Sequence, residues 1–164
     1  MKTAMLFPET EIQEKPRQHY ESMQVVRIAL VKERPLLYEG QRLTAPNQIR
    51  AAFQELLGDA DREYFLAFML DGKNRISSCN VVSVGSLNQA IVHPREVFKA
   101  AILSNAAAII VAHNHPSGDT SPSREDREIT RRLKEAGDMI GIRVLDHIIL
   151  GESGYLSFTE QGLL

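Results

Sequence analysis

The sequence has little of what several protein classes require. Its 164 residues include one cysteine, Cys79, and no tryptophan. One cysteine excludes an internal disulfide and a cysteine-rich metal site, and with them a zinc nucleobase deaminase, whose site needs Pro-Cys-x-x-Cys. No window has the length and hydrophobicity of a membrane span, and residues 1–20 hold no apolar stretch of signal-peptide length. We therefore expect a cytoplasmic protein without a membrane partner.

An excess of charge of one sign is also lacking. The 19 Lys and Arg residues nearly balance the 21 Asp and Glu residues, which gives a net charge of −2, and no Lys/Arg-rich run occurs. A balanced surface gives no electrostatic reason to expect binding to a phosphate backbone. Charge alone therefore argues against nucleic acid as a partner.

What is present is the pattern of one α/β domain. Residues 1–22 are polar and include two prolines, so we expect a flexible arm there and a single domain over 23–164. Hydrophobic periodicity and turn residues predict strands over 24–32, 64–70, 75–84, 107–112 and 142–150, and helices over 46–58, 94–106 and 123–141. Because strands interleave with helices and one pair forms a hairpin, we expect a mixed sheet covered by helices.

Two histidines follow one buried strand in the stretch HNHPSGDTSPSRED, residues 113–126. His113 and His115 are two positions apart, and alternate residues of an extended chain share a face. Two steps cover about 6.6 Å, a distance that two imidazoles can span to bind one ion at about 2.0–2.1 Å. Read alone, the two histidines could equally be ordinary loop residues.

The end of the same stretch predicts the start of a helix. Ser123 and Asp126 have the spacing of a capping box before an amphipathic run. The turn-forming residues before them allow Asp126 to fold back against the histidines. Three protein ligands would leave an open fourth position, which is typical of catalytic zinc. Capping alone explains Ser123 and Asp126 equally well, but the conjunction with two histidines favours a metal site.

Such a site needs a proton acceptor, and Glu63 stands directly before the buried strand 64–70. If that strand lies beside 107–112, the Glu63 carboxylate can approach a metal-bound water; otherwise Glu63 is a solvated acid. We interpret His147, in the last strand, as a satisfied core histidine in preference to a partner of the metal ligands. We interpret Cys79 as a small core residue in preference to a nucleophile.

The histidine stretch, with PREVFKAAI before it and VLDHIIL after it, resembles the JAMM (MPN-type) metallopeptidase motif and, in particular, the bacterial RadC family. The resemblance covers about residues 45–160. It implies a three-layer α-β-α sandwich with a mixed sheet, similar to that of cytidine deaminases.

The resemblance also implies roles for five side chains. The residues that match the family's zinc ligands are His113, His115 and Asp126, so the expected cofactor is Zn2+. Glu63 matches the general base and Ser123 the residue that helps to hold the tetrahedral oxyanion. The implied activity is that of a metalloprotease-like hydrolase, which cleaves the amide bond of a peptide or isopeptide substrate with a metal-bound water.

One departure from the family bears on a second function. Many RadC-like proteins carry an N-terminal helix-hairpin-helix module of the DNA-binding type, and the residues before the domain here are too few for one. We expect this to weaken the family's DNA-repair label. The alternative function is a non-catalytic or nucleic-acid-processing RadC-like domain associated with DNA repair. The presence of all four ligand and catalytic residue types favours the enzyme.

Overall fold

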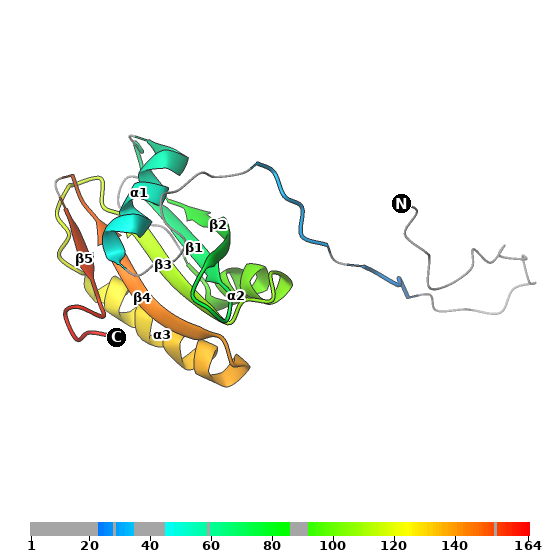
Figure 1. Cartoon of the computed structure of the whole chain (residues 1–164). Coiled ribbons are helices and arrows are strands. Elements are labelled where there is room, and N and C mark those ends of the chain that lie inside the picture. Colours follow the sequence, from blue (N-terminus) through cyan, green and yellow to red (C-terminus); the bar gives the residue numbers. More distant parts are fainter. Residues whose placement is uncertain (1–22, 28, 35–44, 59, 86–91, 153) are drawn as a thin grey trace, which may run out of the picture.

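The computed structural model describes residues 23–164 except 28, 35–44, 59, 86–91 and 153 (Figure 1). In chain order the described elements are α1 (Pro46–Leu57), β1 (Tyr64–Leu70), β2 (Ile76–Val84), α2 (Pro94–Leu103), β3 (Ala108–Asn114), α3 (Arg124–Ile140), β4 (Arg143–Leu150) and β5 (Tyr155–Ser157). The strands form one sheet of order β2-β1-β3-β4-β5. The expected arm at 1–22 lies outside the described residues.

The sheet is mixed, and helices cover both of its faces. β3 pairs antiparallel with β1 and parallel with β4. Because alternate side chains of a strand point to opposite faces, β1 contributes to two separate core clusters. Phe65 packs with residues of α2 and α3, whereas Leu66 packs with residues of α1. Figure 1 shows α1 on one side of the sheet and α2 and α3 on the other. The central strand β3 is thus covered on both faces.

Most of the expected elements are confirmed, with changed ends. The hairpin of β1 and β2 forms as expected, but β3 runs on to Asn114, so His113 lies within the strand. The short strand β5 was missed because three residues give no readable periodicity. Cys79, on β2, packs against the core cluster beside α1, and burial raises the pKa of its thiol to about 12. That pKa fits a core residue and not a nucleophile.

The strand expected over 24–32 is wrong. Its described residues adopt neither helix nor strand, and their side chains are exposed, with Val25 87% and Val31 81% accessible. Strand propensity reflects packing against neighbouring strands more than an intrinsic backbone preference. The described β-branched residues Val25, Val26 and Val31 pair with no described strand, and Figure 1 shows this segment leading away from the sheet.

Helix α3 approaches the sheet closely through a glycine. On this helix Leu133 is fully buried, whereas Ile140 near its end is 43% exposed. Gly137 is buried as well. A Cβ at this position would collide with the carbonyl oxygen of Ile142 and lie 3.2 Å from Cζ of Phe98. The absence of a side chain therefore sets the distance between α3 and the residues leading into β4.

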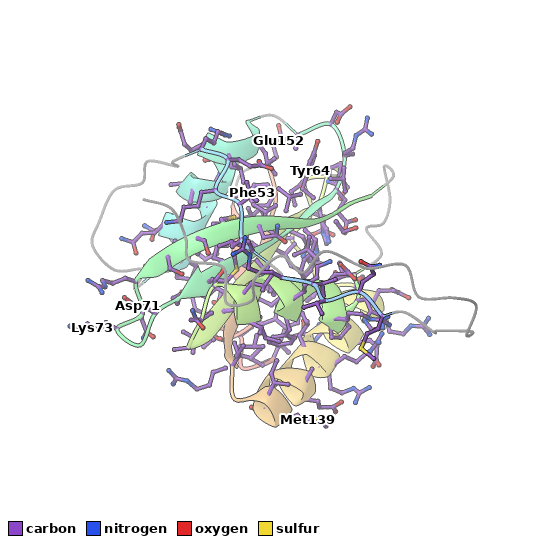
Figure 2. All side chains as sticks on the ribbon, turned by 90° about the vertical axis from the view of Figure 1, so that its right-hand side faces the viewer. Phe53, Tyr64, Asp71, Lys73, Met139 and Glu152 are labelled. Carbon is purple, nitrogen blue, oxygen red and sulfur yellow. The ribbon has the colours of Figure 1, made fainter. Side chains whose placement is uncertain are left out.

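We expect Gly137→Ala to lower the free energy of unfolding by about 1–3 kcal/mol, because the added methyl forces α3 away from its neighbours. The matched control is Gly72→Ala in the hairpin turn between Asp71 and Lys73 (Figure 2), where a Cβ meets nothing within 4 Å. Chemical denaturation measures both. Equal stability of the Gly137 variant and the parent would contradict the close approach, since alanine otherwise favours a helix.

None of the described helices combines the length and hydrophobicity needed to cross a membrane.

Candidate metal centre

The three residues expected as metal ligands lie together where β3 ends. His113 is on β3, His115 lies just beyond it, and Asp126 is in the first turn of α3. The Nε2 atoms of the two histidines are 3.0 Å apart. Oδ1 of Asp126 lies 3.1 Å from Nε2 of His113, and Oδ2 lies 3.5 Å from Nε2 of His115. One atom of each residue thus falls within 4.8 Å of the others, a grouping that can hold a metal ion.

The Asp126 carboxylate takes part in a helix cap at the same time. The backbone N–H and the hydroxyl of Ser123 both donate to Oδ2 of Asp126, at 2.7 Å each. The N–H of Asp126 donates to Oγ of Ser123 at 3.0 Å, which completes a capping box. The capping and metal-site interpretations therefore do not exclude each other. The cap holds Oδ2, and Oδ1 faces His113.

A backbone contact fixes the orientation of the His115 ring. Nδ1 of His115 lies 2.6 Å from the carbonyl oxygen of Asp119. A carbonyl only accepts, so this nitrogen carries the proton. In the neutral ring the lone pair is then on Nε2, on the side of Asp126. The N–H of His115 donates to the carbonyl of Leu150 at 2.8 Å, which ties the residue to the end of β4.

A chain of buried hydrogen bonds fixes the orientation of the His113 ring. The Thr130 hydroxyl donates to the carbonyl oxygen of Asp126 at 2.5 Å, so its oxygen accepts from Nδ1 of His147, also at 2.5 Å. Nε2 of His147 is then the acceptor for Nδ1–H of His113, at 2.8 Å. Burial lowers the pKa of His147 well below its usual value, which keeps this ring neutral. The chain leaves the lone pair of His113 on Nε2, the atom that faces Asp126.

His147 is therefore more than the satisfied core histidine expected from the sequence. It is fully buried, as expected, but it contacts His113 directly. In the parallel pairing of β3 and β4 it lies opposite Val111 and so shares a sheet face with His113. A histidine inside an apolar strand was the available signal, whereas nothing in the sequence pointed to Thr130. Metal-bound histidines usually donate their second ring N–H to such a partner.

The chemistry of this donor set fits a cation. Burial raises the pKa of Asp126, but His113 and His115, which donate to this carboxylate when their rings are protonated, outweigh burial and hold the pKa well below its usual range. The group is an ionised carboxylate beside two imidazole nitrogens 3.0 Å apart. Two lone pairs at that distance repel unless a proton or a cation lies between them. Two imidazoles and one carboxylate can supply three ligands to such an ion.

The structure also brings Glu63 toward the cluster. β1 lies beside β3, as expected, with Phe65 opposite His113. Glu63 comes two residues before Phe65, and His115 two residues after His113, so both lie at the same end of this strand pair. The hydrogen bond with Asp126 is the main cause that raises the pKa of His115, and the charge of Glu63 adds to the effect. Glu63 therefore lies within electrostatic reach of the candidate metal centre.

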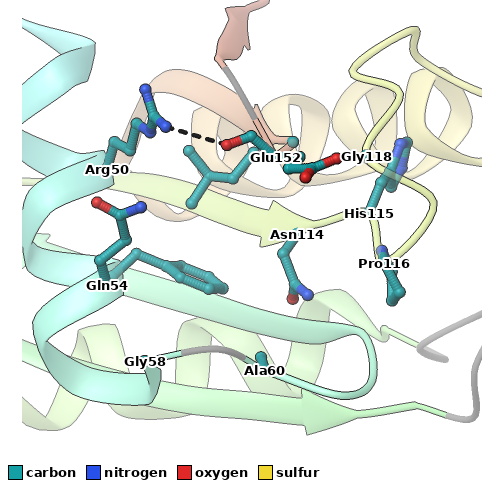
Figure 3. Close-up of a pocket in the computed structure, with 12 residues that line it drawn as sticks. Arg50, Gln54, Gly58, Ala60, Asn114, His115, Pro116, Gly118 and Glu152 are labelled. Carbon is teal, nitrogen blue, oxygen red and sulfur yellow. Dashed lines mark hydrogen bonds between the residues drawn. The ribbon is translucent and has the colours of Figure 1, made fainter.

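A pocket of about 300 Å³ opens beside His115, on the side of the sheet that α1 covers (Figure 3). Its walls come from α1, the loop after α1, the end of β3 and the end of β4. The lining residues are Arg50, Phe53, Gln54, Gly58, Ala60, Asn114, His115, Pro116, Gly118, Leu150, Gly151 and Glu152. Of the two histidines of the cluster, only His115 lines this pocket. The pocket therefore reaches the candidate metal centre at His115, from the side of α1.

Comparison with known proteins identifies the domain as one of the JAB/MPN type. Residues 43–163 match the family model described as RadC-like JAB domain, so the chain belongs to that family. It is 61% identical over 123 residues to a UPF0758 protein of Pelobacter propionicus, covering 75% of this chain and 54% of the relative. Identity to a UPF0758 protein of Geobacter sulfurreducens is 57% over 129 residues, covering 79% and 56%. The chain thus spans about half the length of these curated relatives.

The buried chain behind His113 leads to a prediction about metal affinity. Thr130→Val keeps the shape of the side chain but removes the hydroxyl that accepts from His147, so His113 loses its fixed orientation. We expect metal binding to weaken about 10-fold, within the range for partners of metal-bound histidines. Thr130→Ser, which keeps the hydroxyl, is the matched control. Competition with a chelator measures both affinities, and an unchanged affinity of the valine variant would refute the role of this chain.

Proposed function

We propose that the protein is a zinc-dependent hydrolase of peptide or isopeptide amide bonds, with His113, His115 and Asp126 as the zinc ligands. The observation that carries the proposal is the convergence of two Nε2 atoms and one carboxylate beside a pocket. Two imidazoles and a carboxylate leaving one position open are typical of catalytic zinc. When bound, zinc would polarise a substrate carbonyl and lower the pKa of a coordinated water to about 7.

The protein side chains then have distinct tasks. Glu63, whose charge acts on His115, accepts the proton of the attacking water and passes it to the leaving nitrogen. Ser123 donates its hydroxyl to Asp126 in this structure. To help hold an oxyanion, as in the related enzymes, that hydroxyl turns from Asp126 toward the substrate.

The pocket beside His115 is the proposed place for the substrate chain next to the scissile bond. Phe53 and Leu150 give it apolar surface, and Gln54 gives it a polar group. Nε of Arg50 is buried and, within the described part of the chain, has no hydrogen-bond partner. This nitrogen is a donor that a bound substrate group could engage.

The alternative of a non-catalytic or nucleic-acid-processing domain rests on the family resemblance. No contact among the described residues favours it, and the balanced net charge of −2 gives it no support. A cytoplasmic location and a three-layer architecture similar to that of cytidine deaminases remain predictions.

We expect the purified protein to carry about one zinc ion per chain by elemental analysis, and His115→Ala to abolish it, because two remaining ligands bind zinc weakly. His93→Asn is the control. His93 caps α2 by accepting the N–H of Arg95, and asparagine can also accept there. Stoichiometric zinc in the His115 variant would remove this residue from the ligand set.

Glu63→Gln should keep the zinc and lower turnover by about 10²–10⁴-fold, the usual contribution of a general base. Glu55→Gln, an exposed acid on α1, is the control. The assay uses internally quenched peptides with α-linked and Lys Nε-linked amide bonds, with single-stranded and duplex DNA in parallel. Undiminished cleavage by the Glu63 variant would exclude Glu63 as the base. Metal-dependent DNA cleavage without peptide cleavage would favour the alternative function.

A further inference from the structure

Asn114, between the two histidines, has no part in the metal cluster. It is the last residue of β3, so its side chain points to the sheet face opposite that of His113. That face carries the pocket, and in Figure 3 the Asn114 side chain points away from His115 and toward the loop before β1.

The amide of Asn114 holds the backbone on both sides of Glu63. Its Oδ1 accepts the N–H of Tyr64 at 2.8 Å, and its Nδ2 donates to the carbonyl of Arg62 at 3.0 Å. The carbonyl of Glu63 itself accepts the N–H of Gly85, at 2.8 Å. The polypeptide is therefore held at three successive residues, and the middle one is the proposed base.

The two hydrogen bonds of the Asn114 amide tie the chain at the start of β1 to the end of β3, beyond the last backbone pairing of these strands. Phe65 is the first residue of β1 that pairs with β3 through the backbone. Asp61 and Arg62, just before the strand, are exposed and paired with each other. A strand end of this kind frays readily unless something holds it. A side-chain amide offers one acceptor and two donors on a short stem, which suits a neighbouring backbone N–H and carbonyl. Alanine offers neither, and an ionised aspartate accepts but does not donate.

We propose that Asn114 is a positioning residue for Glu63. By holding the Arg62 carbonyl and the Tyr64 N–H, it fixes the backbone that carries the Glu63 carboxylate. The inference rests on the proposed function, in which Glu63 is the base. Catalytic groups need to be held within about 0.5 Å of the productive geometry, and a displacement of about 1 Å can cost 10²-fold in rate. A released strand end permits such a displacement without touching a metal ligand.

The test compares Asn114→Ala with the parent in the zinc-loaded protein, using the fastest-cleaved peptide of the screen above. We expect zinc to stay near one ion per chain, kcat to fall about 10–100-fold with KM little changed, and hydrogen exchange at the Tyr64 amide to speed up. Asn80→Ala, at an exposed position on β2, is the control. Unchanged kcat in the Asn114 variant would overturn the proposal, as would an unchanged exchange rate.

A double variant separates positioning from general stabilisation. If Asn114 acts only through Glu63, adding Asn114→Ala to Glu63→Gln lowers kcat no further; a full multiplicative loss would overturn the proposal. If Asn114→Ala folds poorly, Asn114→Asp keeps the acceptor for Tyr64 but loses the donor to Arg62. We then expect a protected Tyr64 amide with lowered kcat, and parental kcat would count against the proposal.

The failure of this inference differs from the failure of the proposed function. An inactive Glu63→Gln beside a fully active Asn114→Ala refutes the positioning role alone. A fully active Glu63→Gln refutes the base, and the role of Asn114 falls with it.

Discussion

A single residue, Asp126, joins the start of α3 to the end of β3, and the geometry of the candidate site depends on it. Its carboxylate serves the helix cap through Oδ2 and faces His113 through Oδ1. Its backbone carbonyl ends the chain that runs through Thr130 and His147 back to the same histidine. The contacts therefore form a closed circuit that leaves from the carbonyl of Asp126 and returns to its carboxylate. Any shift of the helix start changes both the ligand and the orientation of its neighbour.

The rigidity of this circuit depends on how tightly its imidazole rings are packed. The ring of His113 stacks on Phe65 with centroids 5.8 Å apart, and the ring of His147 stacks on Phe158 at 4.8 Å. All four rings are at most 2% exposed. Because neutral imidazoles fill this space as aromatic rings do, the hydrophobic core and the hydrogen-bond chain occupy the same volume. The close approach of α3 at Gly137, three turns along the helix, belongs to the same packing.

The sequence revealed what is local and missed what depends on register. The three expected ligands fall in fourteen residues, and a loop of that length can close on itself. His147 lies 34 residues from His113, and its contact depends on the parallel pairing of β3 and β4. The contacts of Asn114 could not be predicted from the sequence, because they depend on the direction in which its side chain points at the end of β3. The strand expected over 24–32 failed for the opposite reason, since residue type suggested pairing where the described fold provides no partner.

The side chains of the triplet His113-Asn114-His115 lie on both faces of the sheet. His113 points to the face of α3, where it is 1% exposed and surrounded by aromatic rings. Asn114 points to the face of α1, and His115, past the end of the strand, is 18% exposed in its side chain and lines the pocket. A ligand arriving through the core would have to displace the buried rings. The pocket opens on the side of α1, where Asn114 also holds the backbone on both sides of Glu63. Strand alternation alone thus places the buried ring of His113 and the pocket-lining side chain of Asn114 on opposite faces of the sheet.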